Sequence, residues 1–220
     1  MAFENRAQAG QMLAGRLDAY RGQHPLVLAI PRGAVPMGKI VADRLDGELD
    51  VVLVRKLRAP YNPELAIGSI DETGTVYLDA ETRDLWVEPY LEGEKKVQLD
   101  TLQRRRQMYE PAGSPIDAAG RVVIVLDDGI ATGSTMIAAL RAVRARRPSK
   151  LIAATGVASA DALRLIRREA DEVVCLETPE PMYAIGYHFR DFSQVSDEEV
   201  VATLQAARKP RGTTEMGASR

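Results

Sequence analysis

Short apolar runs alternate with longer stretches of helical periodicity along most of the chain. Runs of apolar residues bounded by turn residues predict buried strands, and apolar residues three or four positions apart predict helices. The expected strands are residues 26–30, 49–56, 75–78, 121–126, 151–158 and 172–177. The expected helices are residues 3–20, 37–45, 84–110, a stretch ending near 147, and 161–170. This alternation predicts an α/β fold, with a mainly parallel, twisted sheet flanked by helices.

Two stretches depart from this rhythm. Residues 57–69, LRAPYNPELAIGS, contain two prolines and no clear period, and we expect a long loop there. Residues 84–110 are charged with little apolar surface, and we interpret them as an insertion packed over the core.

The domain organisation follows from these patterns. We expect a single domain over residues 1–208, with a small hood built from the N-terminal segment and residues 80–115 and 178–208. Residues 209–220 are polar and contain glycine, and we expect a disordered tail.

The composition is that of an ordinary globular protein and argues against a membrane or nucleic-acid-binding protein. The chain is 45% hydrophobic and 27% charged with a net charge of −2, which gives no bulk attraction to nucleic acid or membranes. No apolar run approaches the roughly 20 residues of a membrane span, and no signal peptide is visible. Cys175 is the only cysteine, so no internal disulfide can form, which fits a cytoplasmic location and a packed strand thiol. The arginine-rich stretches at 104–106 and 141–150 are more typical of solvated helix faces than of a nucleic-acid site.

The stretch VVIVLDDGIATGSTM, residues 122–136, carries the candidate chemistry. Asp127 and Asp128 come at the end of a buried strand, and ligands of parallel sheets bind beyond the carboxyl ends of the strands. Adjacent carboxylates can accept hydrogen bonds from a vicinal diol, and they also attract Mg²⁺. The alternative is that both acids only cap a helix, although one acid would suffice and a second would be a buried cost.

The small residues that follow can wrap a phosphate. Their backbone N–H groups can approach closely, their hydroxyls add donors, and a helix begins there. The residues concerned are Gly129, Ala131, Thr132, Gly133, Ser134 and Thr135. A diol binder followed by a phosphate cradle predicts a ribose-5-phosphate site. No lysine follows the glycine, so the loop is not a P-loop.

This motif resembles the 5-phosphoribosyl 1-diphosphate (PRPP) motif of type I phosphoribosyltransferases, and the layout is similar to uncharacterised bacterial members. The resemblance covers most of residues 24–192, and one departure is Gly129, where the family usually has an aliphatic residue. It implies Mg²⁺-dependent transfer of the phosphoribosyl group to a nitrogenous acceptor, with Asp127 and Asp128 in catalytic roles and the residues of the loop binding PRPP.

The segment IPRGAVP resembles the pyrophosphate loop of the same family. The resemblance implies that Arg32 and Gly33 bind PRPP, and that a cis peptide joins Pro31 to Arg32. Ala34 stands where the family has a second glycine. The alternative is that Arg32 is an ordinary surface charge.

The segment VRKLRAPYNPELAIGS stands where the family has its flexible catalytic loop. Arg55 and Lys56 would meet the pyrophosphate, and Arg58 would act in catalysis as residues 57–62 close over it. The alternatives are a solvated strand end and a fixed surface loop stiffened by its prolines.

The segment MYAIGYHFRDF resembles the part of purine phosphoribosyltransferases that places an aromatic side chain over the base. By that comparison Tyr183 binds the base, and Asp191 lies near the metal. The alternative is that Tyr183, Tyr187 and Phe189 are core aromatics. His24 and His188 have no partners at metal-ligand spacing.

The acceptor stays open. Family members that use 6-oxopurines usually have an acid before the Thr-Gly of the loop, and this chain has Ala131, which argues against guanine and hypoxanthine. The same fold could also serve a regulatory protein that senses PRPP or a nucleotide without catalysis. The sequence leaves open whether the chain forms a homodimer.

Overall fold

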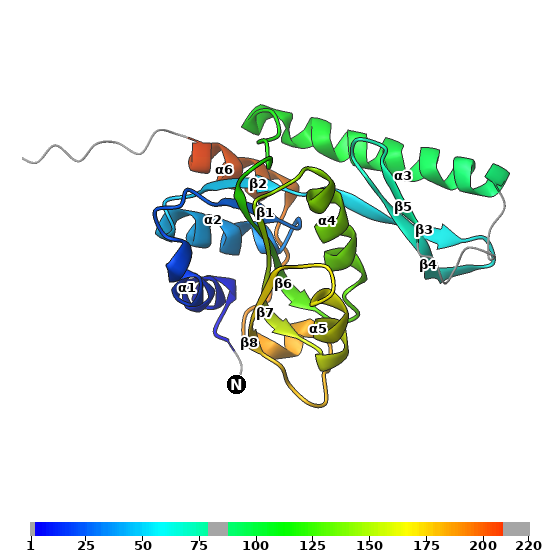
Figure 1. The fold of residues 1–220 in the computed structure, drawn as a ribbon. Helices are drawn as coiled ribbons and strands as arrows, with labels where there is room; N and C mark the ends of the chain where they lie inside the picture. The colour runs from blue at the N-terminus through cyan, green and yellow to red at the C-terminus, as the bar shows by residue number, and fades with distance from the viewer. Residues whose placement is uncertain (1–2, 79–87, 209–220) are drawn as a thin grey trace, which may run out of the picture.

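The structure is a computed structural model that describes residues 3–78 and 88–208. The expected disordered tail at 209–220 lies outside the described residues. At the centre is a parallel sheet of five strands in the order β2-β1-β6-β7-β8 (Figure 1). Its strands are β1 Leu26–Ala29, β2 Glu48–Val51, β6 Val122–Ile130, β7 Lys150–Ala158 and β8 Glu172–Glu177. The predicted α/β fold with a mainly parallel sheet is confirmed.

Helices cover both faces of this sheet (Figure 1). The helices α1 Arg6–Arg16, α2 Ala34–Arg44 and α6 Asp197–Arg208 pack on one face, and α4 Ser134–Ala145 and α5 Ala160–Ile166 pack on the other. Strand β6 is buried on both faces. Ile124 and Leu126 lie in the core beneath α1, α2 and α6, while Val123 and Val125 lie in the core beneath α4 and α5. A strand that is buried on both faces reads as a continuous apolar run, as residues 122–126 do.

A separate arm is built from residues 54–78 and the long helix α3 Glu88–Tyr109, and it projects from the body (Figure 1). Its antiparallel sheet contains β3 Val54–Ala59, β4 Asn62–Asp71 and β5 Val76–Leu78. The predicted short strand at 75–78 is confirmed, and the predicted helix at 84–110 is confirmed over its described part.

Two expectations for this region are wrong. The strand predicted at 49–56 is two strands, β2 and β3, and the loop predicted at 57–69 is mostly strand. Pro60 lies in the turn between β3 and β4, where it interrupts no ladder hydrogen bond. Register shifts on both sides of Arg58 blur the alternation of the sequence, although Leu57 and Ile67 are fully buried.

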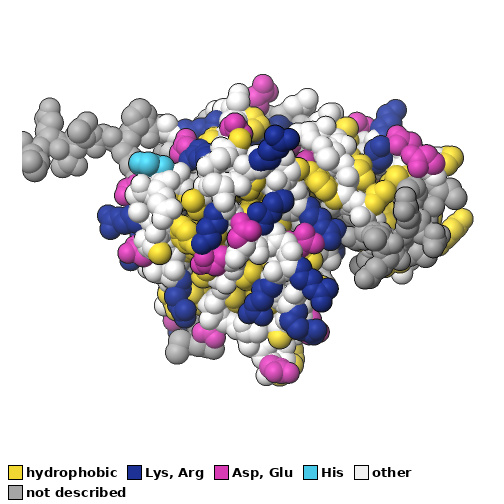
Figure 2. All heavy atoms as spheres, in the orientation of Figure 1, with side chains coloured by type: hydrophobic (Ala, Val, Ile, Leu, Met, Phe, Trp, Pro, Cys, Tyr) yellow, Lys and Arg dark blue, Asp and Glu magenta, His cyan; other side chains and the backbone are white. Residues whose placement is uncertain are grey.

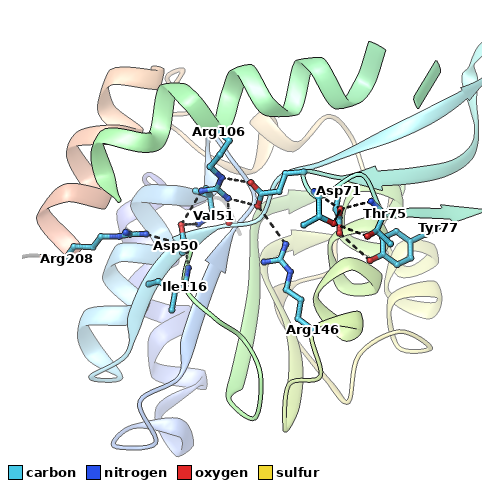
Figure 3. Close-up of polar contacts among 11 residues, drawn as sticks. Asp50, Val51, Asp71, Thr75, Tyr77, Arg106, Ile116, Arg146 and Arg208 are labelled. Carbon is cyan, nitrogen blue, oxygen red and sulfur yellow. Dashed lines mark hydrogen bonds and ion pairs between the residues drawn. The ribbon is translucent and has the colours of Figure 1, made fainter. Parts of the chain in front are cut away.

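Buried charges fix the root of the arm (Figure 3). Arg106 of α3 donates to Glu72 Oε1 over 2.6 Å and lies 3.8 Å from Asp50 Oδ1 on β2. Arg208 of α6 lies 3.4 Å from the other oxygen of Asp50, and Arg146, which follows α4, lies 3.8 Å from Glu72. One network therefore ties the arm to the sheet, α4 and α6.

The sequence reading missed helix α6. Its start carries a capping box, in which Ser196 N–H donates to Glu199 Oε2 over 2.7 Å and Glu199 N–H donates to Ser196 Oγ over 3.1 Å. The Ser-x-x-Glu spacing is a signal that the sequence offers for this helix. Three short 3₁₀ turns complete the described structure: η1 Asp18–Tyr20, η3 Glu110–Ala112 and η4 Ile185–His188. Within residues 3–78 and 88–208, no helix combines the length and the apolar character needed to cross a membrane.

Candidate functional site

Strand β6 delivers Asp127 and Asp128 to the carboxyl edge of the sheet. Because β1 pairs in parallel with β6, the turn after β1 lies beside these acids. A methyl group placed on Gly33 would lie 2.1 Å from Asp128 Oδ2, so this turn can approach the carboxylate only because residue 33 is glycine. The structure thus brings together two segments that are about a hundred residues apart in the sequence.

A cavity of about 190 Å³ opens at the end of β6 and the start of α4. Most of its lining comes from the predicted phosphate loop, and Ile185 is added from the C-terminal segment. The lining residues are Asp127, Gly129, Ile130, Ala131, Thr132, Gly133, Thr135, Met136 and Ile185. The loop is held in place by Ser159, whose hydroxyl donates to Ala131 O over 2.7 Å, while Thr132 Oγ1 and Ser134 Oγ lie 3.2 Å apart. The cavity therefore offers backbone, hydroxyls and one carboxylate beside a helix N-terminus, which suits a phosphorylated sugar.

The two acids have different environments. Asp127 accepts a hydrogen bond from Asp128 N–H over 2.9 Å. Burial, and next the charge of Asp128, raise the pKa of Asp127 well above its usual range. Asp128 instead accepts a charge-assisted hydrogen bond from Arg6 Nε over 2.8 Å, and both side chains are nearly buried.

The turn before Gly33 has the predicted backbone, because the peptide bond between Pro31 and Arg32 is cis. Arg32 is half-buried, and its Nη1 lies 3.4 Å from Asp197 Oδ2 at the start of α6. Tyr109 donates to the other oxygen of Asp197 over 2.7 Å. Arg32 therefore has a carboxylate of the protein as its partner.

The cations of the arm are held by α3. Arg55 Nε donates to Gln98 Oε1 over 2.6 Å, and burial, with the nearby charges of Arg105 and Arg58, lowers the pKa of Arg55. Arg58 is exposed, and its backbone N–H donates to Glu94 over 3.2 Å. In the described part of the chain, none of Arg32, Arg55, Lys56 and Arg58 lines the cavity.

The C-terminal segment contributes Ile185 to the lining of the cavity. Tyr183 is 63% exposed with its ring 6.1 Å from the ring of Tyr187, whereas Ile185 lines the cavity. A methyl group on Gly129 would lie 2.3 Å from Ile185 Cγ2, so the missing side chain at position 129 makes room for Ile185. The glycine at position 129, where the family usually has an aliphatic residue, was therefore a sign in the sequence that another side chain packs against this position.

Asp191 forms a local turn at the surface. Its Oδ1 accepts from Ser193 N–H over 3.0 Å and from the Ser193 hydroxyl, and these hydrogen bonds lower the pKa of Asp191. Across the described residues, no group of three or more His, Cys, Asp or Glu side chains is placed to hold a metal ion.

Arg6 is the second residue that the sequence reading missed. It precedes Ala9, Gly10 and Leu13 at helical spacing, so it lies on the buried stripe of α1. A charged residue in line with an apolar stripe indicates a buried partner, and here the partner is Asp128.

Comparisons with known proteins show the family of the chain. Residues 3–189 match the phosphoribosyl transferase domain family. Two curated proteins from strains of Mycobacterium tuberculosis, both named "Putative phosphoribosyl transferase", are 40% identical over 209 residues, which cover 94% of this chain and 47% of theirs. The chain thus spans about half the length of these curated relatives.

Solved structures show the same architecture. The crystal structure of TT1426 from Thermus thermophilus is 40% identical with a TM-score of 0.88, covering 94% of this chain and 99% of that one. The structure of AQ2163 from Aquifex aeolicus is 14% identical with a TM-score of 0.51, covering 82% of this chain and 78% of that one, and it shows likeness of fold alone.

Proposed function

Because the chain belongs to the phosphoribosyl transferase domain family, we propose that it transfers the 5-phosphoribosyl group of PRPP to a nitrogenous acceptor and releases pyrophosphate. In this reaction the acceptor nitrogen forms a bond to C1 of the ribose while the bond from C1 to the pyrophosphate oxygen breaks. The acceptor loses its proton to solvent.

The observation that carries the proposal is the cavity at the end of β6. Its lining combines residues 131–133 and 135 of the phosphate loop with Asp127, and Asp128 is the next residue of β6. Backbone N–H groups at the start of α4 suit the 5-phosphate, and the two acids suit the ribose hydroxyls. A helix cap would explain one of these features but not their combination around one cavity.

Each group then has a distinct task. The loop and the acids hold the ribose so that C1 faces the acceptor, which is a positioning effect. Arg32, Arg55 and Lys56 stabilise the charge of the leaving pyrophosphate, and Arg58 joins them when the hairpin of β3 and β4 closes and excludes water. Arg32 and Arg55 must exchange Asp197 and Gln98 for the ligand to do so.

The donor set fits Mg²⁺ that arrives with the diphosphate. Mg²⁺ is commonly held by one or two carboxylates together with substrate phosphates and water, and Asp127 and Asp128 offer such oxygens. When bound, the ion would neutralise charge on the pyrophosphate.

The acceptor lies on the side of the cavity that Ile185 covers. Ala131 supplies no carboxylate to an acceptor nitrogen, and Ile185 presents an apolar side chain over Gly129. These two residues favour a flat, weakly polar acceptor over a 6-oxopurine, and Tyr183 lies in the same segment as a further candidate for base stacking.

A PRPP sensor without catalysis is the second candidate. It is favoured by the pairing of Arg32 with Asp197 and of Arg55 with Gln98, since both cations already have partners in the protein. A role in binding nucleic acid gains less support. Lys and Arg side chains are interspersed with Asp and Glu over the face shown in Figure 2, and Arg144 pairs with Asp171 over 2.7 Å.

Pyrophosphate release separates the two candidates. The full chain is incubated with PRPP and Mg²⁺ against a panel of purine and pyrimidine bases, with the Asp127→Asn/Asp128→Asn double variant as the background. We expect release that depends on one acceptor and is absent from the double variant. Binding of PRPP without release for any acceptor would establish the sensor, and failure to bind PRPP would contradict both candidates.

A further inference from the structure

Arg6 connects three parts of the molecule with one guanidinium group. Its Nε donates to Asp128 Oδ2 over 2.8 Å, its Nη1 donates to Ser193 O over 2.7 Å, and its Cζ lies 3.8 Å from the centre of the Phe192 ring. The side chain is only 13% exposed. The guanidinium is therefore held at Nε, at Nη1 and on one planar face, which leaves it little freedom to rotate.

The helix that carries Arg6 is itself fixed at its start. Asn5 caps α1 by accepting from Gln8 N–H over 3.0 Å. Just before it, Phe3 forms a parallel bridge with Phe189, with Phe3 N–H donating to His188 O over 2.8 Å and Arg190 N–H donating to Phe3 O over 2.8 Å. The N-terminal segment and the C-terminal segment are therefore joined close to Arg6.

Asp128 Oδ2 is clamped from two sides. Gly33 packs so closely that a methyl group there would lie 2.1 Å from this oxygen, and the same methyl group would lie 3.1 Å from Arg6 Nη2. Arg6 Nε donates to this same oxygen. The carboxylate is thus held at Oδ2, in a side chain that is 12% exposed.

We propose that Arg6 is a positioning residue for the ribose diol, an inference that rests on the proposed function. By fixing Oδ2 against the Pro31–Gly33 turn, the guanidinium sets the orientation of the Asp128 carboxylate, so that its remaining oxygen can accept from a ribose hydroxyl. Because Arg6 also holds Ser193 and Phe192, it aligns the diol site with the C-terminal segment that carries Ile185. Arg6 itself contacts no reacting atom.

A ligand pair isolates this role. Ribose 5-phosphate and 2-deoxyribose 5-phosphate differ only in the hydroxyl at C2. The ratio of their affinities therefore measures the hydrogen bond from this hydroxyl to the acids, and the contribution of the phosphate loop cancels. Calorimetric titration of both ligands is compared for the wild-type chain, Arg6→Met, Arg6→Lys, and Arg16→Met as a matched control at the exposed end of the same helix.

The wild-type chain and Arg16→Met should prefer ribose 5-phosphate by about tenfold, the effect of one hydrogen bond to a charged group. In Arg6→Met the ratio should fall to about one, while affinity for the deoxy ligand changes little, and Arg6→Lys should recover part of the preference. If Met at this position prevents folding, Arg6→Gln takes its place and is judged by the same ratio.

The outcomes separate the two levels of inference. A full ribose preference in Arg6→Met or Arg6→Gln would overturn the role of Arg6 and leave the proposed function intact. A wild-type chain that binds neither ligand, or both equally, would remove the diol site itself and the role of Arg6 with it.

Discussion

The carboxyl edge of the five-stranded sheet and the projecting arm hold their candidate ligand groups in different ways. At the edge, the ligand groups are backbone and short side chains that follow directly from a buried strand, and Asp128 is fixed by Arg6. In the arm, Arg55 is held by Gln98 of α3, and Arg58 lies exposed beside a register shift. For the proposed function, this means that the sugar-phosphate half of the site is preformed, whereas the pyrophosphate half has to exchange protein partners for the ligand.

The largest effect should come from replacing both acids at the edge of the sheet. We expect the Asp127→Asn/Asp128→Asn variant to lose at least about 100-fold in affinity for PRPP, because both carboxyl groups that face the ribose are replaced by amides. Calorimetric titration measures this loss. The control is Asp161→Asn on α5, whose side chain is 83% exposed. Affinity near that of the wild type would mean that both acids are only structural.

The two acids should then respond in opposite directions when stability is measured. Asp128→Ala leaves Arg6 nearly buried without its partner and should lower the free energy of unfolding by about 3 kcal/mol. Asp127→Asn should raise it at neutral pH, because burial raises the pKa of Asp127 in the folded protein and makes its ionisation unfavourable there.

The pH dependence of Asp127→Asn has a definite sign. An acid with a raised folded pKa loses stability as pH rises above its unfolded value, near 3.8, so the advantage of the variant should be small at pH 4 and grow toward neutrality. Denaturant titrations at several pH values check this. An advantage that does not change with pH would show that Asp127 is not the source.

The arm should matter only for ligands that carry pyrophosphate. We expect Arg55→Met/Lys56→Met to weaken PRPP binding by about tenfold, the effect of roughly one charge-assisted contact, and to leave ribose 5-phosphate binding unchanged. Parallel titrations with both ligands provide the comparison. Equal losses for the two ligands would show that the arm shapes the preformed half as well.

The smallest effect should be a change in mobility at the tip of the arm. Residues 57–62 span the end of β3 and its turn, and the amide hydrogens of the turn around Tyr61, which is 98% exposed, should exchange quickly in the free protein. PRPP with Mg²⁺ should slow this exchange as the hairpin closes, while residues 131–135 change less. Slow exchange in the free protein that ligand does not alter would contradict closure.

The difference between the sheet edge and the arm also explains which parts of the structure could be predicted from the sequence. The strand of residues 122–126 is apolar on both faces and ends in two acids and small residues, so the local pattern alone places the edge of the site. The arm could not be found this way, because Pro60 and the register shifts around Arg58 hide its strands. Ile185 and Arg6 act on residues more than 50 positions away, and such contacts depend on the fold.

Helix α6 is a different case, because its capping box was present in the sequence at Ser196 and Glu199 and was overlooked. The pairing of Arg32 with Asp197 at the start of that helix follows from the fold, since the two residues are far apart in the chain.

A crystal structure of the full chain with PRPP and Mg²⁺ tests the division into a preformed half and an exchanging half most directly. We predict that the 5-phosphate lies against the backbone of residues 131–135 and the ribose hydroxyls against Asp127 and Asp128, with β6 and Arg6 unmoved. Arg32 and Arg55 should leave Asp197 and Gln98 to contact the pyrophosphate. A ligand bound elsewhere, or a loop at 131–135 that must rebuild to admit the phosphate, would contradict this division.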